Sequence, residues 1–127
     1  MKYGYVRSAT HIEREINNQT ETLKGYGVEE IIVERSGRDL DDLIARLQRG
    51  DEIHVVTLDR ISRRSSEFLK KAEMIKNAGG SLMIENRNFD KIVTSIDEAL
   101  LRVSEILPEK KKKNPLRRFL SIFKKKS

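Results

Sequence analysis

The sequence opens on a short run that reads as a sheet strand followed by an arginine and three small residues, Tyr3-Gly4-Tyr5-Val6-Arg7-Ser8-Ala9-Thr10. Runs rich in aromatic and β-branched residues favour strands. Three further runs of this kind occur at 30–34, 53–58 and 81–85. The run at residues 3–7 is therefore predicted to be the first of four strands.

Segments with helical periodicity separate these runs, at residues 13–25, 39–49 and 65–78. Each has apolar residues on one side and ends at or just before glycine, which is typical of helix C-termini. Alternating strands and helices predict an α/β fold, a three-layer α/β/α arrangement with a mostly parallel sheet. Ligands usually bind at the C-terminal ends of such strands, and both Ala9 and Asp59 are expected there.

Composition limits the class of protein. The chain has 127 residues and no cysteine, so we expect one domain with an appendage and no disulfide. No apolar signal segment opens the sequence, which favours a cytoplasmic location. The net charge is +6, but residues 109–127 hold nine Lys/Arg and one Glu and account for +8, so residues 1–108 carry −2. The predicted domain is thus slightly acidic, and the excess basic charge lies in the C-terminal segment.

Two motifs resemble the catalytic domain of serine recombinases, the resolvase/invertase family. They are the opening run, which matches Tyr-x-Arg-x-Ser-Thr except at Ala9, and Leu58-Asp59-Arg60-Ile61-Ser62-Arg63. Gln19 and the pairs Gly27-Val28, Ser36-Gly37 and Gly50-Asp51 also follow the order of the family. The resemblance implies a resolvase-like fold over residues 1–107. It also implies phosphoryl transfer on DNA by a serine, with arginines stabilising the phosphate and no metal or other cofactor.

The resemblance assigns a phosphate-binding role to residues near the two motifs: Arg7, Ser8, Asp59, Arg60 and Arg63. Arginine suits this role because its guanidinium pairs well with phosphate oxygens. A structural role is an alternative. Asp59 and Arg60 could pair with each other at the sheet edge, and Arg63 could cap the neighbouring helix.

Ala9 stands where the family has its nucleophilic serine, and a methyl group cannot attack a phosphodiester. Ser8 and Thr10 flank it, but neighbours on an extended strand point to opposite faces. The loop after Ser36-Gly37 is also short, and only Arg38 remains where the family usually places a further arginine. From these departures we expect no catalytic residue, and hence a protein that is not an enzyme.

A further helix is predicted over residues 94–107, ending before Pro108. Its apolar stripe is Ile96, Leu100, Val103 and Leu107. This stripe resembles the start of the family's dimerisation helix and predicts self-association; packing on its own sheet is the alternative. No helix-turn-helix module is expected after it.

The C-terminal segment combines a lysine-rich linker, residues 108–114, with a predicted amphipathic helix, residues 115–126. One side is apolar, with Leu116, Phe119, Leu120, Ile122 and Phe123, and the remainder is basic, with Arg117, Arg118, Lys124, Lys125 and Lys126. Such a helix could dock on the protein itself, bind nucleic acid, or attach to an anionic membrane. Membrane attachment uses both the apolar and the basic residues.

The sequence therefore favours a catalytically inactive, recombinase-like protein that self-associates and attaches peripherally to the inner face of a membrane. A DNA-binding accessory, or a partner of an active recombinase, is the second hypothesis. An active resolvase or invertase is the third. No small-molecule substrate is indicated.

Overall fold

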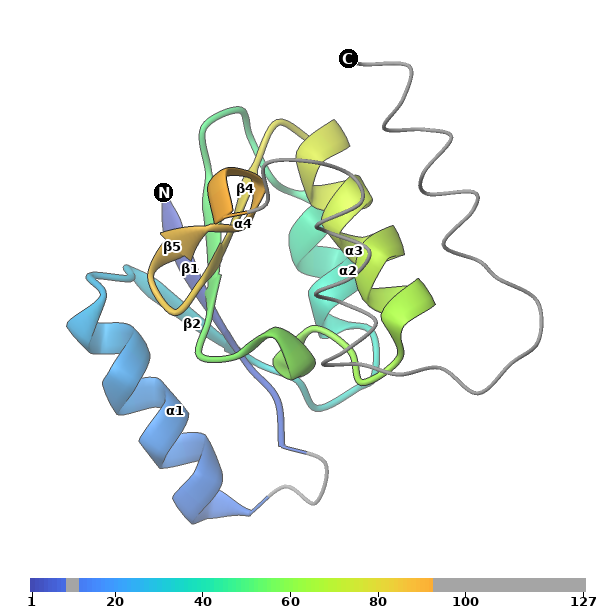
Figure 1. Cartoon of the computed structure of the whole chain (residues 1–127). Coiled ribbons are helices and arrows are strands. Elements are labelled where there is room, and N and C mark those ends of the chain that lie inside the picture. Colours follow the sequence, from blue (N-terminus) through green and yellow to red (C-terminus); the bar gives the residue numbers. More distant parts are fainter. Residues whose placement is uncertain (9–11, 93–127) are drawn as a thin grey trace.

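The structure, a computed structural model, describes residues 1–8 and 12–92, which form a sheet with helices on both faces (Figure 1). The strand order is β2-β1-β3-β4-β5. The strands span Lys2–Val6 (β1), Glu30–Val33 (β2), Glu52–Val55 (β3), Ser81–Ile84 (β4) and Arg87–Asn88 (β5). Strands β1 to β4 are parallel, and β5 is antiparallel to β4. The predicted α/β fold with a mostly parallel sheet is confirmed.

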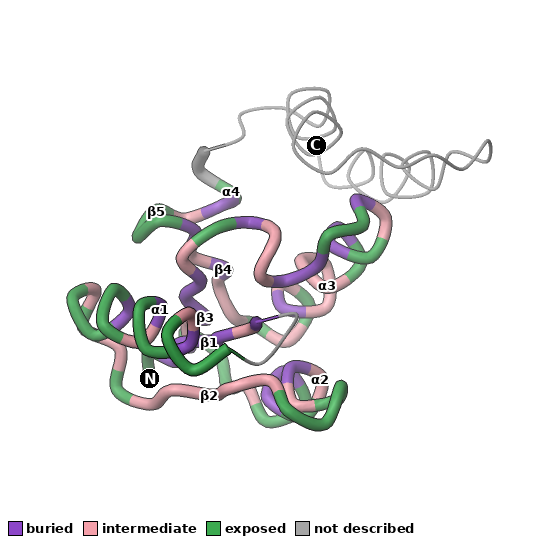
Figure 2. The backbone as a smooth tube through the Cα atoms, turned by 90° about the horizontal axis from the view of Figure 1, so that it is seen from below, coloured by how far each residue is buried: buried purple, intermediate pink, exposed green. Residues whose placement is uncertain are grey.

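Helices cover the two faces unequally. They span Glu13–Gly25 (α1), Asp39–Ala45 (α2), Ser65–Asn77 (α3) and Phe89–Ile92 (α4), with a 3₁₀ turn, η1, at Leu58–Arg60. Helix α1 lies on one side of the sheet, and α2 and α3 lie on the other (Figures 1 and 2). The first and third of these helices match the predicted ranges to within one residue.

The core is divided by the sheet because successive strand residues point to opposite faces. In β1, Tyr5 packs in the larger cluster, with residues such as Ile53 and Phe68 beneath α2 and α3. The next residue, Val6, packs with Leu23 under α1 on the other face. Since β1 is buried on both faces, it runs through the middle of the fold.

Gly4 allows α1 to approach β1 closely. A Cβ atom placed there would lie 2.8 Å from Cδ1 of Ile31 and 3.1 Å from Cδ1 of Leu23. Real Cβ contacts are longer, so a larger residue would require the Ile31 and Leu23 side chains to shift. Side chains of β2 and α1 therefore pack directly over Gly4.

Helix α2 is shorter than the predicted range of 39–49. It ends at Ala45, and the next two residues form turn-like bonds, with Arg46 N donating to Leu43 O at 3.1 Å and Leu47 N to Ile44 O at 3.2 Å. Leu47 nevertheless packs against the core. The apolar periodicity thus indicated correctly which side chains point inward, although the helix stops earlier.

Strand β5 was not predicted. A tight turn joins it to β4, with Glu85 at φ 52° and Asn86 at φ 61°. Positive φ values are unusual outside glycine, and Glu-Asn carries no glycine to indicate a hairpin. The predicted helix at 94–107, the linker at 108–114 and the amphipathic helix at 115–126 lie outside the described residues. Within residues 1–8 and 12–92, no helix has the length and apolar character needed to cross a membrane.

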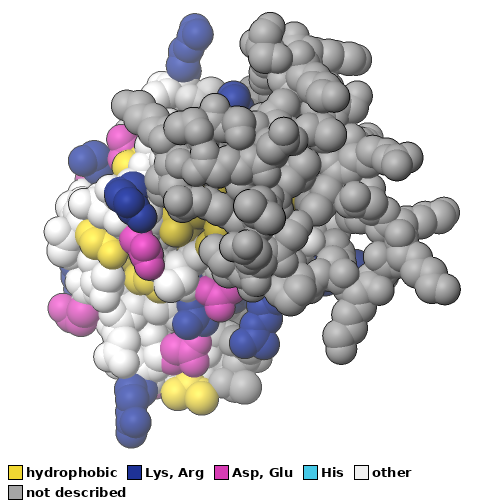
Figure 3. Space-filling model, viewed as in Figure 1, with side chains coloured by type: hydrophobic (Ala, Val, Ile, Leu, Met, Phe, Trp, Pro, Cys, Tyr) yellow, Lys and Arg dark blue, Asp and Glu magenta, His cyan; other side chains and the backbone are white. Residues whose placement is uncertain are grey.

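The visible surface of the described part mixes the two signs of charge. In Figure 3, acidic and basic side chains lie next to one another over the face that is not hidden by grey atoms. This arrangement agrees with the slightly acidic balance of residues 1–108. No extended patch of one charge is visible on this face of the described part (Figure 3).

Candidate functional site

The end of β1 is fixed to helix α1 by a buried glutamine. Gln19 is 4% exposed, and its side-chain amide bonds both backbone groups of Arg7. Arg7 N donates to Oε1 of Gln19 at 3.3 Å, and Nε2 of Gln19 donates to Arg7 O at 2.9 Å. Because both groups are held, the backbone at Arg7 has a defined position just before the Ser8–Thr10 segment.

Arg60 reaches the same place from the end of β3. It closes η1, and its Nη1 donates to Arg7 O at 3.1 Å and to Oε1 of Glu15 at 2.7 Å. Its Nε is buried and has no hydrogen-bond partner among the described residues. The structure therefore places the Arg60 guanidinium on the backbone carbonyl of Arg7. Within the described part of the chain the ion-pair partner of Arg60 is Glu15, a residue the sequence did not single out.

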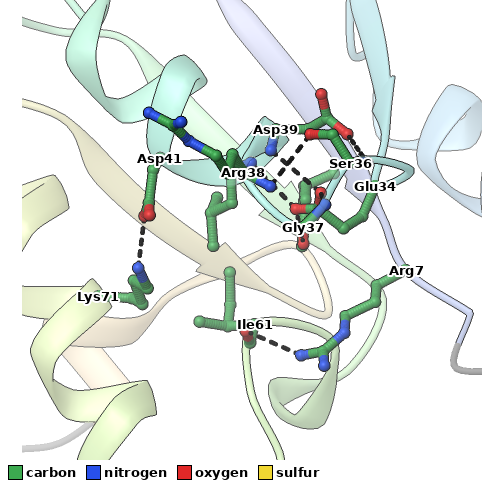
Figure 4. Close-up of polar contacts among 11 residues, drawn as sticks. Arg7, Glu34, Ser36, Gly37, Arg38, Asp39, Asp41, Ile61 and Lys71 are labelled. Atoms are coloured by element: carbon green, nitrogen blue, oxygen red, sulfur yellow. Dashed lines mark hydrogen bonds and ion pairs between the residues drawn. The ribbon is translucent and has the colours of Figure 1, made fainter.

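The Arg7 guanidinium points towards a small cavity of about 110 Å³ between the sheet and α2 and α3. Nη1 of Arg7 donates a long hydrogen bond, 3.5 Å, to Ile61 O (Figure 4). Other residues around the cavity include Tyr5, Glu34, Gly37 and Lys71. Lys71 is ion-paired with Asp41 (Figure 4). Among the described residues the Arg7 guanidinium donates to a neutral carbonyl, and the carboxylates that line the cavity are those of Glu34, Asp41 and Glu67.

The other predicted site residues have different surroundings. Ser8 is buried, and its Oγ accepts a hydrogen bond from Ile12 N at 3.2 Å, at the start of α1. Asp59 accepts a hydrogen bond from the Thr57 hydroxyl rather than pairing with Arg60. Arg63 is exposed. Ala9 lies outside the described residues. Ser8 thus lies next to Arg7 and contacts the start of α1. Asp59 contacts Thr57, two residues before it.

Glu34 organises the Ser36-Gly37 loop, a role that sequence analysis missed. Its Oε2 accepts from Gly37 N at 2.9 Å and Asp39 N at 3.0 Å, and its Oε1 accepts from Leu40 N at 3.1 Å. Oε1 also accepts from the Tyr5 hydroxyl at 2.8 Å. The carboxylate therefore joins the end of β2 to the start of α2. The available signal was an acidic residue placed just before a turn and a helix.

A second carboxylate closes the same loop. Oδ2 of Asp39 accepts from Arg35 N at 2.6 Å and Ser36 N at 2.9 Å (Figure 4). These two backbone donors, led by Arg35, lower the pKa of Asp39 to about 2. Burial, followed by the hydrogen bond to Glu34, raises the pKa of Tyr5 above its usual value. The loop is thus held by the two carboxylates, and Arg38 is exposed beside it.

Residues 2–126 match the family described as the N-terminal domain of resolvase. The chain belongs to this family. The resolvase-family domain described here is 36% identical to a resolvase of Clostridium perfringens over 90 residues, which are 65% of this chain and 47% of that protein.

Two other relatives come from transposons. The transposon Tn917 resolvase of Enterococcus faecalis is 27% identical over 115 residues, 86% of this chain and 61% of that protein. The transposon Tn552 DNA-invertase BinR of Staphylococcus aureus is 33% identical over 99 residues, 72% of this chain and 51% of that protein. The resolvase-family chain therefore spans about half to three fifths of the curated relatives it matches.

These matches correct the expectation that the chain is not an enzyme. That expectation was wrong, because the family and the relatives bear the names of recombination enzymes, resolvase and DNA-invertase. It relied on Ala9 and on the short loop after Ser36-Gly37, where only Arg38 remains. The neighbouring Ser8 and Thr10 both carry hydroxyls, and Arg7 and Arg60 converge on the end of the strand that leads to them.

Proposed function

We propose that this resolvase-family domain acts on DNA in site-specific recombination, and that it binds the DNA backbone at the C-terminal edge of its sheet. Two cations at this edge carry the proposal: the Arg7 guanidinium borders the cavity, and Nη1 of Arg60 donates to the backbone carbonyl of Arg7 at 3.1 Å. Phosphoryl transfer depends on positioning and on cations around the charged oxygens. The names of the relatives support DNA as the source of the phosphate.

Arg7 is the cation best prepared to contact that phosphate. Its backbone is fixed by Gln19, and its guanidinium bonds a carbonyl rather than a carboxylate. A phosphate could therefore pair with Arg7 without displacing an anion. Contacts of this kind position the DNA backbone, and they do not by themselves read its sequence.

The test compares two arginine variants of the full chain in binding to a short, fluorescently labelled DNA duplex. Arg7→Ala should weaken binding and reduce the slope of log affinity against log salt by about 0.9, the value for one phosphate contact. Arg46→Ala is the matched control, because Arg46 pairs with Glu30 and lies over Tyr3 at the opposite edge of the sheet. Equal losses in both variants would show that only net charge matters and would contradict the proposal.

The reaction is tested by incubating the full chain with supercoiled DNA and then separating covalent protein–DNA adducts under denaturing conditions. Recombination chemistry at this edge predicts an adduct in which a side-chain hydroxyl oxygen bonds to the DNA phosphorus and a deoxyribose hydroxyl is released, and this adduct should be lost in Arg7→Ala. An intact DNA affinity without any adduct would restrict the domain to DNA binding, as an accessory or as a partner of another recombinase.

The sequence after the described residues supports a second candidate function: attachment of a self-associated protein to an anionic membrane. In the proposed helix at 115–126, apolar residues would enter the interface while the basic residues meet anionic lipids. Self-association through Ile96, Leu100, Val103 and Leu107 would join two or more such segments and increase their effective concentration at the surface.

Co-sedimentation with anionic and neutral vesicles tests this candidate, using the full chain and a chain that ends at Pro108. Pelleting on anionic vesicles should depend on residues 109–127 and should be lost in the double variant Phe119→Ser, Phe123→Ser. If the two chains pellet equally, or neither pellets, membrane attachment is excluded. If the phenylalanine variant still binds DNA but lysine neutralisation abolishes that binding, the segment serves nucleic acid.

A further inference from the structure

The three arginines that the resemblance assigned to phosphate have different partners. Arg60 is paired with a carboxylate, because its Nη1 lies 2.7 Å from Oε1 of Glu15. Arg7 donates to a carbonyl oxygen. Arg63 is exposed and forms no ion pair within residues 1–8 and 12–92. Of these three, Arg60 is therefore the cation whose charge is already balanced by the protein itself.

Glu15 holds the position on Arg60 that an incoming phosphate would need. A guanidinium binds carboxylates and phosphates through the same N–H groups and with similar geometry. Nη1 of Arg60 is already shared between Glu15 and Arg7 O. Its Nε is buried away from solvent. A phosphate and the Glu15 carboxylate would therefore compete for the exposed side of one guanidinium.

The position of Glu15 allows it to leave without disturbing the fold. Its side chain is 34% exposed, and it lies in the first turn of the 13-residue helix α1. An acidic residue in the first turn remains favoured by the helix dipole when it faces solvent. Arg60 would still be anchored by its bond to Arg7 O at 3.1 Å. The exchange therefore requires one side-chain rotation.

We propose that Glu15 is an internal competitor for DNA: it pairs with Arg60 in the free protein and is displaced by a backbone phosphate when DNA binds. This inference rests on the proposed phosphate site at Arg7 and Arg60. Glu15 then lowers the affinity of the site for isolated phosphates. Only DNA that also contacts neighbouring cations gains enough binding free energy to displace Glu15.

The experiment measures binding of the full chain to a short, labelled DNA duplex at low salt. Glu15→Gln should tighten binding by about threefold to fivefold, the size expected for removing one partly exposed ion pair. Glu13→Gln is the matched control, because Glu13 lies in the same first turn, is exposed and loses the same charge. It should change the affinity by less than Glu15→Gln. Circular dichroism and the thermal unfolding midpoint establish that each variant is folded.

A second comparison ties the effect to Arg60. In an Arg60→Ala background, Glu15→Gln should no longer tighten binding more than Glu13→Gln does. Weaker binding by Glu15→Gln would show that Glu15 supports Arg60 instead of competing, and would overturn the inference. Equal effects of the two glutamate variants would also overturn it. If Arg7→Ala still weakens binding in that case, the proposed DNA-binding function is kept and only the competition by Glu15 is rejected. If Arg7→Ala has no effect either, both proposals are rejected.

Discussion

Removing the Glu34 carboxylate should loosen the Ser36-Gly37 loop by an amount that can be worked out from its contacts. Glu34 accepts four hydrogen bonds, three from backbone N–H groups and one from the Tyr5 hydroxyl. A typical hydrogen bond contributes about 1 kcal/mol net, and one to a charged group about 1.5–3 kcal/mol. Because the Glu34 side chain is half-buried, water can replace some of these hydrogen bonds in the variant. Glu34→Ala should therefore lower the free energy of unfolding by roughly 3–4 kcal/mol.

Urea unfolding of the full chain, followed by circular dichroism, measures this cost. With a slope of about 1–3 kcal/mol per molar urea, the urea midpoint should fall by roughly 1–4 M. Glu34→Gln keeps an acceptor oxygen and should cost less than Glu34→Ala. Tyr5→Phe removes a single one of the four bonds and should cost about 1 kcal/mol.

The order of these variants decides the matter. If Glu34→Ala costs no more than Tyr5→Phe, the carboxylate does not hold the loop and the reasoning is refuted. If Glu34→Ala instead costs the most, it should also weaken DNA binding, because the loop and Arg7 line the same cavity.

Three further predictions concern the sheet, the loop and the core. Gly4→Ala should lower the free energy of unfolding by about 1–3 kcal/mol in the same urea assay, since its Cβ would lie 2.8 Å from Ile31 Cδ1. The lowered pKa of Asp39 contributes stability that is present above pH 3.8 and is lost as the pH falls towards about 2. Asp39→Asn should therefore flatten the dependence of the thermal midpoint on pH across this range. Phe68→Ala should cost about 3–5 kcal/mol by calorimetry, because Phe68 is 0% exposed and packs edge-on against Phe89 at 5.3 Å; a loss below 1 kcal/mol would contradict this packing.

The sequence predicted the elements whose periodicity is set by one buried face. The stripe in residues 65–78 predicted α3, and Phe68 and Leu69 are buried in it as expected. Strand β5 could not be predicted, because two residues have no periodicity and their pairing depends on the turn at Glu85 and Asn86. Local apolar periodicity therefore predicted the long helices and strands, but it did not predict β5, which is defined by its pairing with β4.

The candidate site divides in a similar way. Arg7 and Arg60 were singled out by the resemblance of their two motifs to serine recombinases, and the structure places both at the C-terminal edge of the parallel sheet. Glu15 and Glu34 were not predicted, because their contacts depend on how α1 and the Ser36-Gly37 loop pack against those strands. Asp59 was expected to take part, yet its described hydrogen bond is with Thr57. Motifs identify the cations, and tertiary packing decides which carboxylates meet them.

The central place of β1 in the sheet has a consequence for synthesis of the protein. Within this sheet β1 is synthesised before the other strands, but it pairs with β2 at residues 30–33 and with β3 at residues 52–54. In a nascent chain, β1 therefore cannot pair on both of its edges until β3 has left the ribosome. Until then, the edge of β1 that binds β3 has no native partner. Translation slowed between β2 and β3 would expose that edge for longest. The same strand carries Arg7 at its end, so the proposed phosphate site is completed only after more than half of the described domain has been made.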